Sequence, residues 1–454
     1  MWDWLKNLRE ILRAGLWLVP AVLIVAESLL ALVVLALDRT RRLEPSGDWL
    51  FGGDKQAALA IVGTIADGVL TVGGVAFSIT VVALALAGSQ YGALQMASYL
   101  RDRLNQFVLG TFVGTFVYCL IVLGNMDAAG GSDGVPEYAV TLAVVLGLLS
   151  LTAFIVLFHH LSQSLQAERL AARLGADLLA KLRSMYPEEA ERRRETANDG
   201  PPDEAGPWTP VLARETGYLQ AIEYKRALAI AIQHDAVVRL SQRAGDFITE
   251  GSPIGRLCHD GARDRADVAA AIARCHLIGH MRTPTQDPEY PVHQLAQIAV
   301  RALSPAINDP YTALICLDWL EAALRVLARG AIAPIACRDG LGRLRIIAPH
   351  AGFAQVADAV FNKVRQAARP HRALMMRLVA MVENVASVVS RDDDRNTLLM
   401  HLRLLDEDGA QGLAVERERV ELHARCAAVE TLLRIETEEK AQRRGAEGAE
   451  TDGS

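Results

Sequence analysis

The segment from Ala57 to Gly88 constrains the fold more than any other, because its thirty-two residues include a single charge, Asp67. A helix of this length measures roughly 48 Å, whereas the hydrocarbon core of a bilayer is about 30 Å thick. The segment is too apolar for the surface of a soluble protein and longer than a simple membrane span. We therefore expect a membrane helix that extends beyond the hydrocarbon.

One face of this predicted helix carries small and polar residues. Residues three and four positions apart share a helix face. Five residues follow that spacing: Thr64, Asp67, Thr71, Gly74 and Ser78. Small residues allow close packing between membrane helices, which is one explanation. The other is that the face lines a polar pore or ion path, which an intramembrane carboxylate favours.

Four long apolar runs fall in residues 15–160, which we predict to be a four-helix transmembrane domain. The runs are Gly15–Leu37, Ala57–Gly88, Phe107–Leu123 and Tyr138–Phe158. The first is too long for the core of a signal peptide and should remain as an anchor. Glu27 lies near its midpoint, where a bare carboxylate costs about 3 kcal/mol, so we expect it to be protonated or to face a partner or water.

The third run contains two glycines four residues apart, Gly110 and Gly114. This spacing favours a tight helix crossing. Because small faces on the second and third runs require partners, we expect the protein to self-associate in the lipid bilayer.

The distribution of Lys and Arg near the ends of the runs predicts the orientation. With the N-terminus inside, nine of them lie on the inner side and four on the outer side, which favours cytoplasmic N- and C-termini. Residues 1–14 are expected to form an interfacial amphipathic helix. The cationic segment after Gly88 would then place Asp67 near the outer mouth, with Glu27 at mid-membrane.

The remaining chain reads as a cytoplasmic α+β domain. We predict a connecting helix over 161–186, a flexible linker over 187–215, a domain over 216–433 and a disordered tail over 434–454. The turn-rich segment 217–258 resembles the barrel-sandwich of biotinyl and lipoyl carrier modules, without the exposed lysine of a carrier. We expect a small barrel-sandwich-like β part, followed by a helix over Asp264–Met281 and a helix start at Asp309 and Pro310.

Six polar residues of this domain form its densest polar set: Arg282, Asp287, Arg301, Ser304, Asn308 and Asp309. They could form a structural network of paired charges. Alternatively, they could bind a small anionic ligand at a helix N-terminus beside two arginines.

Several functional classes receive no support from the sequence. With a net charge of −6, nothing in the sequence favours general nucleic-acid binding, and we expect no nucleic-acid partner. The six cysteines are scattered without metal-ligand spacing, so we expect no metal and no cofactor. The chain has no phosphate-binding loop, nucleophile elbow or zinc-protease motif, so enzymatic activity is not expected.

The segments 279–287 (GHMRTPTQD) and 301–313 (RALSPAINDPYTA) resemble a family of bacterial predicted membrane proteins known as a domain of unknown function. The segments 77–79 (FSI), 87–91 (AGSQY) and 109–118 (LGTFVGTFVY) extend the likeness into the membrane half. One departure is Gly92-Ala93-Leu94, where the family pattern has Pro-Arg after the glycine. The resemblance implies an integral protein of the bacterial inner membrane and no established activity.

Two functions are consistent with these features. The first is an oligomeric ion channel or transporter, in which the polar face of the second run lines the path and Asp67 and Glu27 act on the ions. The second is a membrane-anchored sensor that binds a small ligand in the region of Arg282 and Asp309.

Overall fold

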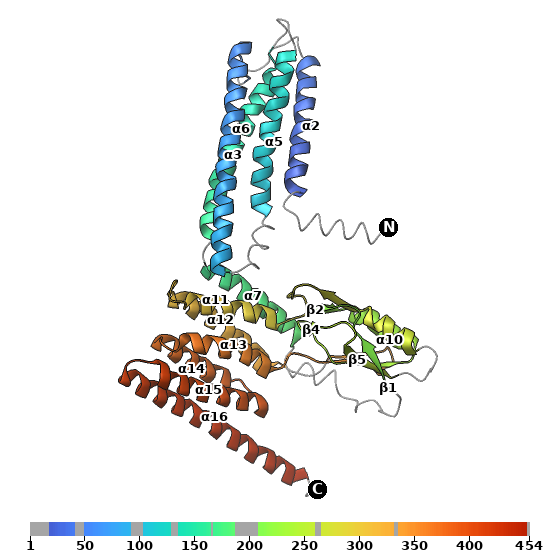
Figure 1. The fold of residues 1–454 in the computed structure, drawn as a ribbon, viewed down its shortest axis with the longest axis vertical. Coiled ribbons are helices and arrows are strands. Elements are labelled where there is room, and N and C mark those ends of the chain that lie inside the picture. Colours follow the sequence, from blue (N-terminus) through green and yellow to red (C-terminus); the bar gives the residue numbers. More distant parts are fainter. Residues whose placement is uncertain are drawn as a thin grey trace. The chain divides into compact units, whose positions relative to one another are not determined.

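The structure is a computed structural model that describes residues 18–40, 50–91, 103–128, 135–164, 167–186, 208–258, 265–330 and 335–451 (Figure 1). The chain divides into two compact units, Met1–Gln166 and Ala167–Ser454. The predicted interfacial helix 1–14 and the predicted linker up to residue 207 lie outside the described residues.

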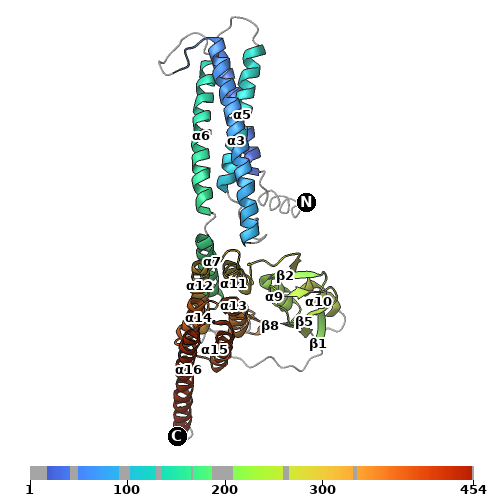
Figure 2. The ribbon, with the colours of Figure 1, turned by 60° about the vertical axis from the view of Figure 1, so that its left-hand side comes forward.

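The first unit consists of four long helices, which confirms the four predicted apolar spans. They are α2 (Leu18–Thr40), α3 (Lys55–Tyr91), α5 (Arg103–Ala128) and α6 (Glu137–Ser164). Each is long and apolar enough to cross a membrane. Figures 1 and 2 show them side by side in one bundle.

Hydrogen bonds at one end of the bundle fix the helices against one another. Asp38 at the end of α2 accepts bonds from the backbone N–H groups of Tyr138 (3.2 Å) and Ala139 (3.0 Å) at the start of α6. The N–H of Phe51, just before α3, donates to Thr141 Oγ1 at 3.0 Å. Both α3 and α6 therefore start at this end and run in the same direction.

The two glycines of α5 lie against α2. A Cβ added to Gly110 would lie 2.9 Å from Pro20 Cα and 2.6 Å from Leu23 Cδ1. A Cβ added to Gly114 would lie 2.8 Å from Glu27 Cδ. The absence of side chains at these two positions is what lets the helices approach this closely.

Replacing Gly110 by valine is therefore expected to destabilise the bundle. The new side chain meets the backbone of Pro20, which cannot move aside as a flexible side chain can. Overpacking of this kind typically costs about 1–3 kcal/mol. The thermal unfolding midpoint in detergent should fall, whereas Gly124→Val on the same helix, where a Cβ meets nothing within 4 Å, should leave it unchanged.

The second unit contains two sheets. The five-stranded sheet has the order β1-β5-β3-β8-β7 and the three-stranded sheet the order β4-β2-β6. The strands are β1 (Trp208–Leu212), β2 (Gly217–Ile222), β3 (Val237–Leu240), β4 (Phe247–Ile248), β5 (Pro253–Cys258), β6 (His276–Gly279), β7 (Ile335–Arg338) and β8 (Leu344–Ala348). Pairing is antiparallel except for β3 with β8. The mixed α and β content is confirmed, but no closed barrel forms within the described residues.

The helices of the second unit are α7 (Ala167–Met185), α9 (Tyr224–Gln233), α10 (Arg265–Ala273), α11 (Glu289–Ala302), α12 (Pro310–Arg329), α13 (Phe353–Ala368), α14 (Arg372–Ala386), α15 (Asp392–Gly412) and α16 (Glu416–Thr451). Helix α7 lies beside α11 and α12 (Figure 2). It shares one core with the helices from α11 onward, in which Leu178 and Leu182 of α7 and Tyr186 directly after it are buried. The segment predicted as a connector is thus part of this core.

Three boundaries differ from the sequence expectations. The helix predicted over Asp264–Met281 is wrong beyond Ala273, because His276–Gly279 forms β6 and obtains its backbone hydrogen bonds from β2. Strand β1 precedes the domain start expected at residue 216, because it pairs with β5. Helix α16 continues to Thr451, through most of the segment expected to be a disordered tail.

His401 on α15 is fully buried in this helical core. Its ring stacks on Phe361 with 4.8 Å between centroids, and Nε2 lies 3.0 Å from Asp358 Oδ1. Burial lowers the pKa of His401 below the ordinary value of 6.5, and Arg365 acts in the same direction while Asp358 opposes it.

This lowered pKa predicts acid destabilisation. Protonation favours the unfolded chain, so the stability that neutral His401 contributes is complete above pH 6.5 and is lost as the pH falls through the folded-state pKa. The thermal midpoint should fall between about pH 8 and pH 5.5, and His401→Phe should reduce that fall. An equal fall of the thermal midpoint in the natural chain and in His401→Phe would contradict this prediction.

Candidate functional site

The five residues predicted to share a face of α3 are all exposed on the outside of the four-helix unit. We call Thr64, Asp67, Thr71, Gly74 and Ser78 the α3 stripe. The hydroxyl of Thr64 donates to the Ala60 carbonyl, and that of Thr71 donates to the Asp67 carbonyl, each at 2.7 Å. The Asp67 carboxylate makes no hydrogen bond or ion pair with any described residue.

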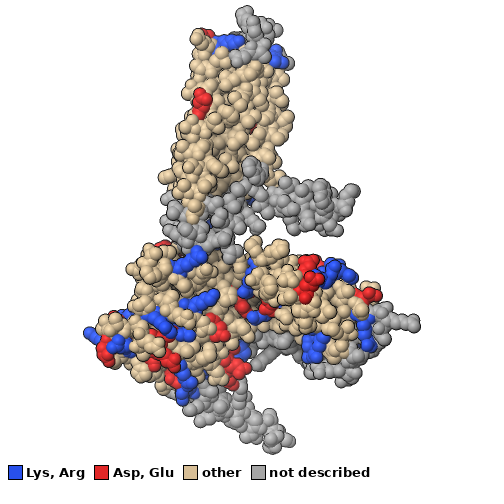
Figure 3. Space-filling view, in the orientation of Figure 1, with Lys and Arg blue, Asp and Glu red and all other residues tan. Residues whose placement is uncertain are grey.

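The surface around the α3 stripe is apolar. Leu70, Val75, Phe77 and Val81 are each about half exposed on the same helix. Figure 3 shows that the face of this unit in view carries very few charged side chains between its ends. A carboxylate is therefore presented on a surface otherwise suited to lipid.

Glu27 faces the opposite environment, the interior of the bundle. Its Oε2 accepts a hydrogen bond of 3.2 Å from Thr115 Oγ1, which in turn accepts one of 3.2 Å from Ser150 Oγ. All three side chains are buried. Glu27 and Asp67 thus do not meet within one chain, and a single path that includes both does not form inside the bundle.

The two carboxyl groups lie at about the same level of the bundle. A Cβ added to Gly147 of α6 would lie 3.0 Å from Ile65 Cγ2, so these residues are opposite each other. Asp67 is two residues beyond Ile65, and Ser150, which belongs to the Glu27 network, is three beyond Gly147. Asp67 and Glu27 therefore lie within about one helical turn of each other along the bundle, and the expectation that Asp67 is nearer the outer side stays a prediction.

A second site lies where strands and helices of the second unit meet. Arg282 contacts Asp287 Oδ2 through Nε at 2.8 Å and Nη2 at 2.6 Å, and Arg243 Nη1 lies 2.8 Å from Glu289 Oε1. Gly245 has φ +100°, and a Cβ there would collide with the Asp287 carboxylate and Arg282 Nη2. Glycine is needed at this position both for the backbone conformation and for the close approach of the ion pair.

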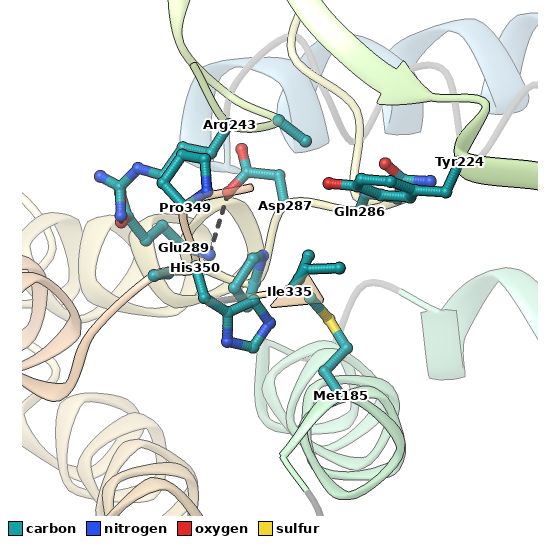
Figure 4. A pocket seen from close by; sticks show the side chains of 12 residues that line it. Met185, Tyr224, Arg243, Gln286, Asp287, Glu289, Ile335, Pro349 and His350 are labelled. Carbon is teal, nitrogen blue, oxygen red and sulfur yellow. Dashed lines mark hydrogen bonds and ion pairs between the residues drawn. The ribbon is translucent and has the colours of Figure 1, made fainter. Parts of the chain in front are cut away.

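A pocket of about 220 Å³ adjoins these ion pairs. Figure 4 shows Arg243 and Glu289 on one side, Tyr224 and Gln286 on another, and Met185 contributed by α7. Burial raises the pKa of Glu289, although Arg243 opposes the shift. Burial also raises the pKa of Tyr224 to about 12, so its hydroxyl stays protonated and can donate a hydrogen bond.

The charges of this pocket do not favour an anion. Arg243 and Arg282 are matched by the carboxylates of Asp246, Asp287 and Glu289. The N-terminus of α11 is already capped, because Asp287 Oδ1 accepts from the N–H groups of Glu289 (3.0 Å) and Tyr290 (3.1 Å). The hypothesis of an anion at this helix N-terminus is therefore not supported, and a neutral or cationic ligand fits the site better.

The other four residues of the predicted set lie at the far end of α11. Arg301 ends that helix, and Ser304, Asn308 and Asp309 form the turn into α12. The fourteen residues of α11 span roughly 20 Å, so Arg282 and Asp309 do not form one pocket. The predicted helix start is confirmed: Asp309 Oδ1 accepts from Thr312 N–H at 3.1 Å, and Pro310 occupies the first helical position.

Residues 13–384 match a family model described as "Predicted membrane protein (DUF2254)". The chain belongs to this family. An uncharacterised protein of Mycobacterium bovis and one of Mycobacterium tuberculosis are each 30% identical to this DUF2254 protein over 390 residues, which cover 84% of this chain and 73% of the relative. No solved structure matches it. The resemblance drawn from the sequence motifs is confirmed, and DUF2254 is a family of unknown function.

The sequence did not reveal four of the residues that line the pocket of this DUF2254 protein: Tyr224, Arg243, Glu289 and His350. They come from separate segments and share no motif spacing. The turn glycine Gly245, two residues after Arg243, gave a local signal, but its closeness to Asp287 depends on tertiary contacts.

Proposed function

We propose that the protein self-associates in the bacterial inner membrane, with both termini in the cytoplasm, and that copies of the α3 stripe line an ion path. The observation that carries this proposal is the exposed Asp67 carboxylate on the apolar outer surface of the bundle. Facing lipid, such a group costs about 2.5–3.5 kcal/mol at the centre of a span. Packing against further copies around water removes that cost.

The dimensions and charge of the α3 stripe suit a cation path. From Thr64 to Ser78 the helix rises by roughly 21 Å, most of the thickness of the hydrocarbon. A ring of Asp67 carboxylates, one from each copy, would attract cations and repel anions. Glu27 lies inside each bundle, so in this proposal it stabilises α2 against α5 and does not contact the ion.

Cation flux in proteoliposomes tests the proposal. The natural chain should release potassium, and Thr71→Leu should reduce the rate because a bulky apolar side chain replaces a small polar one in the path. Thr152→Leu is the matched control, since Thr152 is an exposed threonine of α6 whose hydroxyl likewise bonds the carbonyl four residues earlier. Absence of flux, or equal loss in both variants, would contradict the proposal.

The pocket of the second unit supports a second candidate function, a sensor of a small neutral or cationic ligand. Its support is a preformed cavity with Tyr224, Gln286 and Glu289 in its lining. A panel of small cationic and zwitterionic metabolites should include one that raises the thermal midpoint of the full chain, and Glu289→Gln should remove that rise. A panel that leaves the midpoint unchanged would argue against this candidate.

A further inference from the structure

The turn between α11 and α12, residues 304–309, presents apolar side chains to the outside of the second unit. Ile307 is 44% exposed, and Tyr311, in the first turn of α12, is 63% exposed. Pro305 and Ala306 beside them are exposed as well. The described part of the second unit offers these side chains no cover.

Hydrogen bonds hold this turn in one conformation. Asn308 N–H donates to the Ser304 carbonyl at 2.8 Å, and Asp309 N–H donates to the Ala302 carbonyl at 2.8 Å. Asn308 has φ +49°, in the left-handed region, and the side chain of Asp309 caps α12. The exposure of Ile307 is therefore a property of an ordered turn.

The packing of α7 on α12 shows where the turn lies within the unit. A Cβ added to Gly175 would meet the ring of Trp319, and one added to Gly330 would meet Tyr186. The separation along the chain is eleven positions in both cases, from Gly175 to Tyr186 and from Trp319 to Gly330, so the two helices run parallel and in register. Counting back eight residues on each helix places Tyr311 level with Ala167, at the N-terminal end of α7.

The N-terminal end of α7 is tied to the membrane by the chain itself. Ala167 follows Ser164, the last residue of α6, by three positions, which reach at most about 10 Å. Helix α6 is apolar enough to cross a bilayer. Exposed Arg169 and Arg173 lie in the first turns of α7, where cations suit the phosphates of lipid headgroups.

We propose that the turn 304–309 and the start of α12 dock on the bilayer surface from which α6 emerges, with Ile307 and Tyr311 in the interfacial layer. Tyrosine is favoured at this depth because its ring is apolar and its hydroxyl remains in contact with water. This contact would hold α12, and through it α7, against the lipid surface.

Photocrosslinking in a lipid nanodisc tests this docking. The photoreactive amino acid benzoyl-phenylalanine replaces Ile307 in the full chain. This variant is reconstituted into nanodiscs of phosphatidylcholine and phosphatidylglycerol. The matched control is position 341, where Leu341 is 78% exposed in the β7–β8 hairpin that follows the opposite end of α12. Benzoyl-phenylalanine at position 311 gives a second reporter if the variant at position 307 does not fold.

The expected result is a lipid adduct at position 307 in a yield several-fold above that at position 341. Three outcomes would overturn the proposal: equal lipid yields at both positions, no lipid adduct at positions 307 and 311, or a crosslinked dimer at position 307 without lipid. The dimer would show that a second copy covers the turn instead.

Discussion

Asp408→Ala is expected to destabilise the second unit by about 3–5 kcal/mol, because it leaves the largely buried Arg365, and the partly exposed Arg369, without their counter-charge. Asp408 is 3% exposed on α15. Its two carboxylate oxygens separately bind Arg365 of α13 and Arg369 just beyond the end of that helix. The free energy of unfolding, from denaturant titration of the full chain in detergent, measures the loss.

Glu407→Ala is the control for this prediction, since Glu407 is the exposed neighbour on the same helix. Its effect should stay within about 0.5 kcal/mol. A triple variant, Arg365→Met, Arg369→Leu and Asp408→Leu, should recover much of the stability, because apolar side chains then replace the whole ionic group. If Asp408→Ala costs no more than Glu407→Ala, the ion pairs do not stabilise the core.

Asp67→Asn is expected to lower potassium flux through the reconstituted protein by about tenfold and to weaken the selectivity for cations over anions. The substitution keeps the size of the side chain and removes the charge, so it tests electrostatic attraction alone. Fixed charge in a confined path raises the local concentration of counter-ions by about 10-fold or more. Flux and reversal potential under a salt gradient measure the two effects.

Asp54→Asn provides the matched control for that substitution. Asp54 precedes α3 and accepts a hydrogen bond from Ala57 N–H at 2.9 Å, a capping role that asparagine can also fill. Asp54→Asn should therefore leave the potassium flux and the cation selectivity nearly unchanged. Equal changes in the two variants would mean that surface charge in general, and not the α3 stripe, attracts the ions.

The sequence predicted best what depends on local periodicity. The 3.6-residue period identified the α3 stripe as one face. The capping pair Asp309 and Pro310 identified the start of α12 as the structure has it. Whether that face points into the bundle or to its outside could not be predicted from the sequence, because it depends on how α2, α5 and α6 pack around α3. The level of Asp67 relative to Glu27 also depends on tertiary contacts, such as the hydrogen bond from Phe51 N–H to Thr141 Oγ1 that fixes the start of α3 against α6.

The predictions failed where distant segments determine the local structure. Strand β6 was taken for helix because its apolar run is short, and only its pairing with β2 makes it a strand. The polar set around Arg282 was treated as one group, although α11 separates it into two. Arg243 and Glu289 were missed because nothing in the sequence shows that residues so far apart form an ion pair.

Chemical modification of Ser78→Cys shows whether the α3 stripe lines a water-filled path between copies of the protein. A small water-soluble thiol reagent that carries a quaternary ammonium group is added during a potassium flux measurement, with the natural chain and Thr152→Cys as controls. If the α3 stripe lines such a path, modification blocks flux in Ser78→Cys and has little effect in either control. Unchanged flux in a Ser78→Cys protein that mass spectrometry shows to be modified, or no modification at all, would contradict it.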